Sequence, residues 1–298
     1  MDLRYLYHGE IDYRKWENCI GRSVNLSVYS HTWFLDSLVS DWAGIVDGDY
    51  EAVMPVFFSG NRMYLPEFMV WTGIYSPVFL SQEKCRSFIE FAASRFKYAE
   101  VAFDRFSDCG KCSKGRFLNR SVYLFDMVKN FTDTISDSSE YVKRLMIKLG
   151  SRGFELENIT DTVFAENFVR RNSERNFSFS DTLGRIASCA MRKKACVIFA
   201  LKNKNGVTAG LITAWFAENY IFVPQITVVP EFDKAAGQMI LLYHLMSFFE
   251  GTPMVLVVDP KALEISPQLL AGMGGVQYGL PLWKIDGLSK IMNFFQIF

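Results

Sequence analysis

Residues 220–249 read YIFVPQITVV, then PEFDKAAGQ, then MILLYHLMSFF. This order predicts a strand, a short loop that contains a glycine, and a helix. The first part is rich in β-branched and aromatic residues, which favour a strand. Pro224 has no N–H to give to a neighbouring strand, so the strand must lie at an edge, carry a bulge or separate from its neighbour there. The helix is apolar nearly all round, which indicates that it is buried.

A strand that separates from its neighbour, followed by a loop of small residues and a helix N-terminus, turns backbone N–H groups towards a cleft. Together with the positive end of the helix dipole, these groups favour binding of a phosphate or pyrophosphate. The alternative is that Ala235, Ala236 and Gly237 only let the helix pack closely against the sheet. The residues alone leave both interpretations open.

The composition favours a globular protein of two domains. The chain has 298 residues, half of them hydrophobic, and this length exceeds that of a typical single core. Its 32 basic and 32 acidic residues cancel, which argues against a broad surface for duplex nucleic acid. The first residues, MDLRY, lack the features of a secretory signal, and no apolar run is long enough to span a bilayer. We therefore expect a cytoplasmic protein.

Six cysteines are present, and only Cys109 and Cys112 have a suggestive spacing. A redox pair of this kind should open a helix, which the following residues SKGR do not favour. A zinc site would need a second pair of ligands, but the three histidines, His8, His31 and His244, lie far away in the sequence. We expect a surface loop with reduced thiols and no metal site.

The order of the predicted elements repeats along the chain. In the first half it comprises a helix at 12–20 with Asp12 as its cap, a helix after a Ser30 cap, and a hairpin at 43–58 around an Asp-Gly turn. A strand at 62–65, a helix at 82–96, a strand at 99–103, a loop at 107–120 and a strand at 122–127 follow. In the second half it comprises a linker at 133–139, helices at 140–149, 162–175 and 180–192, a strand meander over 196–229, the apolar helix and a strand at 254–258. Two similar α+β domains are therefore predicted, covering residues 1–125 and 126–298.

Several stretches together resemble one protein family. They are YSHTWFLD at 29–36, the hairpin at 42–55, YVKRLMIK at 141–148 before Gly153, and the strand, loop and helix at 220–249. The second half resembles the GNAT acyltransferase fold, and the whole chain resembles the tandem-GNAT, Fem-like group of bacterial proteins, which includes many uncharacterised members from Bacteroidetes. The resemblance implies two tandem GNAT-like domains, each with a mixed, largely antiparallel sheet flanked by helices.

In GNAT enzymes the pyrophosphate of acyl-CoA binds a loop with the pattern Arg/Gln-x-x-Gly-x-Gly/Ala. Residues 234–239, KAAGQM, keep the basic residue and the first glycine but place Met239 where the family has a tiny residue. The resemblance implies these cofactor-binding residues: Thr227, Val229, Lys234, Ala236, Gly237 and Gln238. Residues 1–125 have no such glycine loop and resemble the degenerate partner domain.

Acyl transfer to an amine requires a deprotonated amine, a polarised carbonyl and a protonated leaving group. Tyr243 on the apolar helix is a candidate acid for the leaving thiolate, and the alternative is a core aromatic residue. Asp259, which follows the strand at 254–258, is a candidate to orient the amine, and the alternative is a turn-forming residue. Gln225 and Thr227 are further polar groups that could face the cleft.

Three functions follow from these residues and the resemblance. The first is an N-acyltransferase in which a small-molecule or peptide amine attacks acetyl-CoA or another acyl-CoA directly. The second is a Fem-type transferase that takes an aminoacyl group from tRNA, which requires the basic clusters on one face of the protein. Two of these clusters are Arg170, Arg171 and Arg175, and Arg192, Lys193 and Lys194. The third is an inactive GNAT-fold protein that binds a ligand. We prefer the first, because the proline bulge and the basic start of the loop are both kept. The oligomeric state is not predicted.

Overall fold

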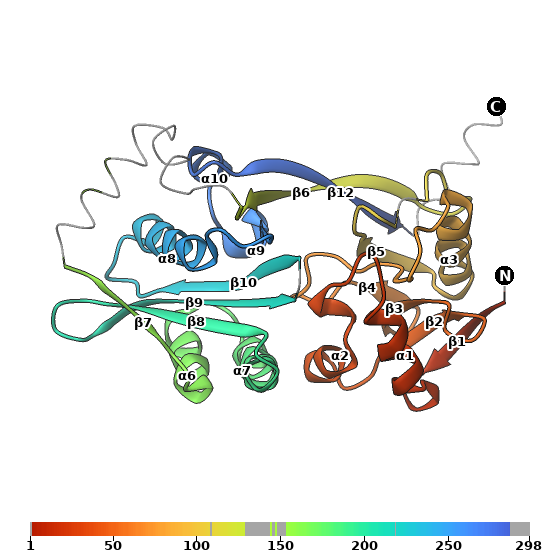
Figure 1. Cartoon of the computed structure of the whole chain (residues 1–298), viewed down its shortest axis with the longest axis horizontal. Coiled ribbons are helices and arrows are strands. Elements are labelled where there is room, and N and C mark those ends of the chain that lie inside the picture. Colours follow the sequence, from red (N-terminus) through yellow and green to blue (C-terminus); the bar gives the residue numbers. More distant parts are fainter. Residues whose placement is uncertain are drawn as a thin grey trace. The chain divides into compact units, whose positions relative to one another are not determined.

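The computed structural model describes residues 2–286 except 108, 129–143, 145–146, 148–152 and 218. The described residues form two compact units (Figure 1). Unit 1 contains the described residues up to 120 and from 279 onward. Unit 2 contains the described residues from 121 to 278. The predicted linker at 133–139 lies outside the described residues, as does the predicted helix at 140–149 apart from Arg144 and Ile147.

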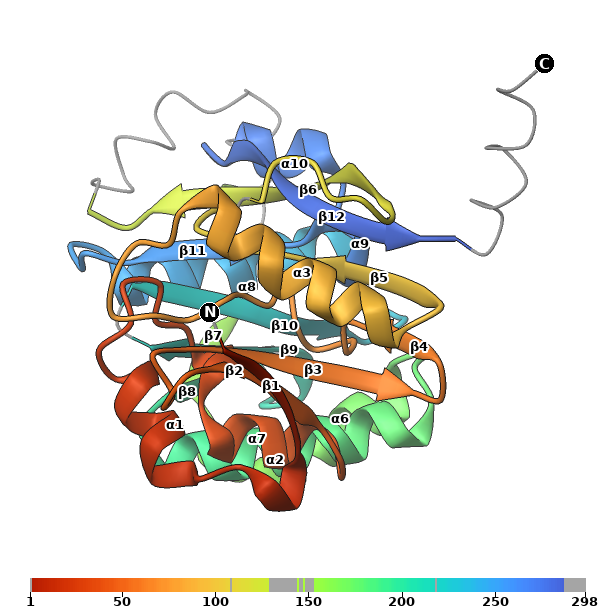
Figure 2. The ribbon, with the colours of Figure 1, turned by 90° about the vertical axis from the view of Figure 1, so that its right-hand side faces the viewer.

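Unit 1 is a mixed, largely antiparallel sheet flanked by helices. Its strands, in spatial order, are β1 (Leu3–Tyr7), β2 (Ala43–Asp47), β3 (Ala52–Ser59), β4 (Arg62–Tyr64), β5 (Tyr98–Ala102) and the end of β12 (Val276–Ile285). Among the strand pairs described in this unit, β4–β5 is parallel and the others are antiparallel. The helices are α1 (Tyr13–Ile20), α2 (Thr32–Leu38) and α3 (Gln82–Arg95), with short 3-10 helices at His8–Glu10 and Val28–Ser30. Figure 2 shows α3 on one side of this sheet and α1 and α2 on the other.

The core of unit 1 joins α3 to the sheet. Phe88 and Ile89 of α3 are fully buried with Met54 and Val56 of β3. The predicted cap at Ser30 is wrong, because Ser30 ends a 3-10 helix. Helix α2 begins at Thr32, whose N–H and hydroxyl both donate to Glu17 of α1 at 2.7 and 2.6 Å.

Unit 2 has the same kind of architecture. Its strands, in spatial order, are β6 (Arg116–Asp126), β11 (Val255–Val258), β10 (Tyr220–Val228), β9 (Thr208–Ala217), β8 (Cys196–Lys202) and β7 (Glu155–Asn158). Strands β10 and β11 run parallel, and the other pairs described within this unit are antiparallel. The helices are α6 (Thr162–Asn172), α7 (Phe177–Arg192), α8 (Lys234–Phe249), α9 (Pro260–Leu263) and α10 (Pro267–Gly272). Helix α8 covers one face of the sheet and α6 and α7 cover the other (Figure 1).

Helix α8 is the centre of the unit 2 core, as its sequence predicts. Leu241, Leu242 and Leu245 are fully buried between β9, β10 and the segment that carries α9 and α10. Two predicted boundaries are wrong. Residues 116–120, predicted as a loop, begin β6, and α8 begins at Lys234 rather than Met239 because Asp233 caps it.

Candidate functional site

Strand β10 separates from β11 after its first three residues. The two strands pair only at Tyr220, Ile221 and Phe222 of β10. The pairing of β10 with β9 shifts register between Phe222 and Gln225, and Pro224 lies in this interval. Of the three alternatives predicted at Pro224, an edge position, a bulge or a separation, the structure shows the bulge against β9 and the separation from β11.

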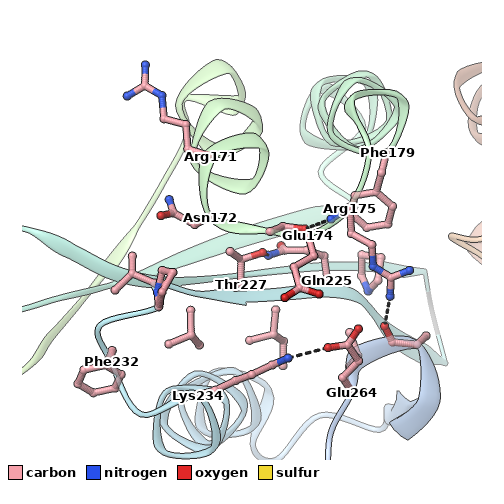
Figure 3. Close-up of a pocket in the computed structure, with 18 residues that line it drawn as sticks. Arg171, Asn172, Glu174, Arg175, Phe179, Gln225, Thr227, Phe232, Lys234 and Glu264 are labelled. Carbon is pink, nitrogen blue, oxygen red and sulfur yellow. Dashed lines mark hydrogen bonds and ion pairs between the residues drawn. The ribbon is translucent and has the colours of Figure 1, made fainter.

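A cavity of about 660 Å³ opens beside the part of β10 that follows Pro224. Its walls come from β10, the loop between α6 and α7, the start of α8, and α9 (Figure 3). The lining residues used below are Arg171, Glu174, Arg175, Phe179, Gln225, Thr227, Val229, Lys234 and Glu264. The cavity lies wholly within unit 2.

The floor of the cavity is a polar network within the sheet. Gln225, Thr227 and Thr213 are each at most 5% exposed. The Gln225 amide nitrogen donates to the Leu211 carbonyl at 3.3 Å and to the Thr227 hydroxyl, and the Thr213 hydroxyl donates to the Gln225 oxygen at 3.2 Å. Because these bonds fix the side chains, the floor has defined polar positions.

Charged side chains of both signs surround the cavity. The Lys234 ammonium lies 2.6 Å from the Glu264 carboxylate, and this contact lowers the pKa of Glu264. Arg175 donates from Nη2 to the carbonyl of Ala262 at 2.8 Å, and its guanidinium lies 5.4 Å from the centre of the Phe179 ring. Arg175 therefore links the loop after α6 to α9 across one end of the cavity.

The N-terminus of α8 is closed by its own cap. The Asp233 carboxylate accepts from the N–H of Ala236 at 3.1 Å, and the Asp233 carbonyl accepts from the N–H of Gly237 at 2.9 Å. A Cβ on Gly237 would lie 2.8 Å from both methyl groups of Val228. Gly237 thus lets α8 pack closely on β10, as the alternative interpretation of the sequence proposed.

Three of the six predicted cofactor-binding residues, Thr227, Val229 and Lys234, line the cavity. Ala236, Gly237 and Gln238 do not line it. Ala236 and Gln238 are each 2% exposed, and the Gln238 amide donates to the Leu263 carbonyl at 3.0 Å. These three residues join α8 to the elements that form the walls.

The two predicted catalytic residues do not line the cavity. Asp259 is 1% exposed and caps α9, because its carboxylate accepts from the N–H groups of Lys261 and Ala262 at 3.0 and 3.3 Å. It thereby positions the α9 wall. Tyr243 is half-buried on α8 and packs against the core of unit 2.

Glu174 and Glu264 line the cavity but were not predicted. Arg175 belongs to a basic cluster that is visible in the sequence, but its place at the cavity depends on how α6 and α7 pack. Glu174 falls inside the helix predicted over 162–175, but α6 ends at Asn172, so Glu174 lies in the loop before α7 and no local pattern marks it.

No known protein-family model and no curated protein matches the sequence. Solved structures do match over the whole chain. FemX is 11% identical with a TM-score of 0.62, over 100% of this chain and 99% of that one. A conserved protein of unknown function from Bacteroides thetaiotaomicron is 11% identical with a TM-score of 0.60, over 92% of this chain and 97% of that one. A tandem GNAT protein from the clavulanic acid biosynthesis pathway is 9% identical with a TM-score of 0.52, over 96% of this chain and 99% of that one.

These likenesses concern the fold, and at this level the predicted resemblance is confirmed. The chain has the tandem-GNAT, Fem-like α+β fold. Within the described part of the chain, none of the helices is both long and apolar enough to cross a membrane.

Proposed function

We propose that this protein is an N-acyltransferase that transfers the acyl group of acetyl-CoA or another acyl-CoA to an amine by direct attack. The observation that supports the proposal is the cavity beside the separated part of β10. Beyond Phe222 this strand has no partner in β11, so an elongated ligand could lie along its edge. The tandem GNAT neighbour has the same fold, which agrees with this class of reaction.

Acyl-CoA supplies the activated carbonyl in this reaction. Thr227 and Val229 would contact the arm that carries the thioester, and Lys234 would contact a phosphate at the mouth of the cavity. The amine must lose a proton before it attacks, and the thiolate must gain one as it leaves. Tyr243 and Asp259 stay candidates for these steps, although the described cavity does not include them.

The direct test is release of free thiol from acetyl-CoA in the presence of a panel of primary amines. We expect at least one amine to give release above the rate without protein. Lys234→Gln should raise the KM for acetyl-CoA, and Lys97→Gln, an exposed lysine of unit 1, serves as the matched control. If no amine and no acyl-CoA gives release, the proposal is wrong.

A second candidate is a Fem-type transfer from aminoacyl-tRNA. One observation favours it: Asp233 places a carboxylate at the N-terminus of α8, where a pyrophosphate would otherwise benefit from the helix dipole. A donor whose phosphates bind elsewhere avoids this repulsion. Transfer of a labelled aminoacyl group from tRNA, with no thiol release from acetyl-CoA, would select this candidate. Failure of both reactions would favour a ligand-binding protein without activity.

The proposal includes a cytoplasmic location. The six cysteines all lie in the described residues and form no disulfide, which is typical of a reducing compartment. The acceptor is proposed to be a small-molecule or peptide amine.

A further inference from the structure

The charges of the cavity in unit 2 point to the kind of acceptor. Two carboxylates and three cationic side chains line it. Lys234 and Glu264 form an ion pair with each other, and Figure 3 shows the Arg171 side chain pointing away from the cavity. Glu174 and Arg175, adjacent residues of opposite sign in the loop between α6 and α7, also line the cavity.

This loop is held in place by hydrogen bonds at both ends. Asn172, the last residue of α6, donates from its amide to the Phe168 carbonyl at 2.9 Å. Asn176 caps α7 by accepting from the N–H of Phe179 at 2.9 Å. Between them, the N–H of Arg175 donates to the Ser173 hydroxyl at 3.0 Å. The backbone of the two charged residues is therefore fixed by local contacts.

The two side chains reach different parts of the cavity. Figure 3 shows the Glu174 side chain extending from the loop into the cavity, with its carboxylate drawn between the loop and Lys234. Arg175 extends to α9, where it contacts the Ala262 carbonyl and contributes to the low pKa of Glu264. A guanidinium carries five N–H donors and suits a planar carboxylate.

Resting on the proposed function, we infer that the acceptor is an amino acid or a similar amino-carboxylate, with its ammonium bound by Glu174 and its carboxylate bound by Arg175. A ligand with only a positive charge would be repelled by the arginine, and a ligand with only a negative charge would be repelled by the glutamate. A zwitterion can place an opposite charge beside each of the two side chains.

The assignment gives Glu174 a defined step in the transfer. The bound ammonium gives one proton to the Glu174 carboxylate, which is exposed and passes it to solvent. The nitrogen lone pair then attacks the thioester carbonyl, so a C–N bond forms and the C–S bond breaks. The second nitrogen proton leaves with the thiolate, and the products are an N-acyl amino acid, free thiol and one released proton.

The test measures acceptor binding by the full chain without any acyl donor. The probes are L-alanine, L-alaninamide, which lacks the carboxylate, and propionate, which lacks the ammonium, and the Kd of each is measured by NMR titration. We expect L-alanine to bind about tenfold tighter than either probe, because each lost charge-assisted hydrogen bond weakens binding on this scale. Equal Kd values for the three probes, or no binding of any, would overturn the inference.

Variants separate the two charges. Glu174→Gln should make L-alanine bind no more tightly than propionate. Arg175→Gln should make L-alanine bind no more tightly than L-alaninamide. Arg175→Lys keeps the positive charge, so in this variant L-alanine should again bind more tightly than L-alaninamide, though by less than in the original protein. Glu231→Gln, an exposed carboxylate of the same unit that does not line the cavity, should change none of the Kd values. A Glu174→Gln protein that is folded by circular dichroism and binds L-alanine like the original would also overturn the inference.

The outcomes for binding and for transfer are distinguishable. L-alanine binding with the expected selectivity but no thiol release from any acyl-CoA would contradict the proposed transfer and keep the acceptor site. Thiol release with amines that shows no preference for L-alanine over L-alaninamide would keep the transfer and overturn the acceptor assignment.

Discussion

Replacement of Gly237 by alanine tests the packing of α8 on β10. The new Cβ would lie 2.8 Å from both methyl groups of Val228 and 3.2 Å from a ring carbon of Phe232. Such overpacking costs about 1–3 kcal/mol, whereas alanine in place of glycine inside a helix gains about 1 kcal/mol. We therefore expect Gly237→Ala to lower the free energy of unfolding by about 1 kcal/mol, despite the better helix propensity.

The assay is urea unfolding followed by far-ultraviolet circular dichroism, with a double-mutant cycle. Val228→Ala removes the two methyl groups that the new Cβ would meet. In that background Gly237→Ala should become stabilising by up to about 1 kcal/mol, because only the 3.2 Å contact with Phe232 still opposes the gain in helix propensity. If Gly237→Ala already stabilises the protein with Val228 present, the close contact does not exist and the reasoning is refuted.

Three further predictions concern other parts of the chain. Burial raises the pKa of Asp104 from 3.8 to about 6. The protonated carboxyl therefore contributes stability that is complete below pH 4 and is lost as the pH rises through 6. Asp104→Asn should remove up to about 3 kcal/mol of this pH dependence, measured by urea unfolding at pH 4 and pH 7. Asp259→Ala should lower the free energy of unfolding by about 1–2 kcal/mol through loss of the α9 cap. Ser266→Ala should change it little in the same assay, because the Ser266 side chain makes no cap hydrogen bond to the α10 backbone and instead bonds the exposed Gln268 side chain. Millimolar acetyl-CoA should raise the melting temperature less in Lys234→Gln than in Lys97→Gln, and an equal rise would remove Lys234 from the donor site.

The sequence predicts those features of the fold that depend on local chemistry. Pro224 implies the separation of β10 because the missing N–H is a property of the residue itself. Asp12 caps α1 as predicted, since its carboxylate accepts from the N–H of Lys15, only three residues away. The apolar residues of α8 likewise predict a buried helix wherever it packs.

Features that depend on contacts between distant residues were not predictable in this way. Helix α2 is capped by Glu17, fifteen residues before Thr32, and not by the neighbouring Ser30. Strand β12 contains Gly279 and Pro281, which disfavour a strand locally, and pairing with β5 compensates for them. Tertiary pairing outweighs local preference in both cases.

In the candidate site, too, local sequence patterns predict some features, whereas contacts between distant residues decide others. The loop pattern at 234–239 indicates where a ligand could bind, but it cannot show which groups face the cavity. Gly237 could serve a ligand or the packing of the helix, and only its distance to Val228 identifies the packing role. Glu174 comes to the cavity through the packing of α6 and α7, so no local pattern marks it.

The most direct measurement of the central claim, an acyl donor bound in the cavity of unit 2, is calorimetric titration of the full chain with acetyl-CoA. Val229→Trp places a large side chain on a half-buried residue that lines the cavity, and Val207→Trp places the same side chain at a position that is 60% exposed and outside it. We predict that the original protein and Val207→Trp bind with the same Kd and that Val229→Trp binds about tenfold more weakly or worse. Absence of binding at millimolar acetyl-CoA, or equal Kd values in all three proteins, would contradict the claim.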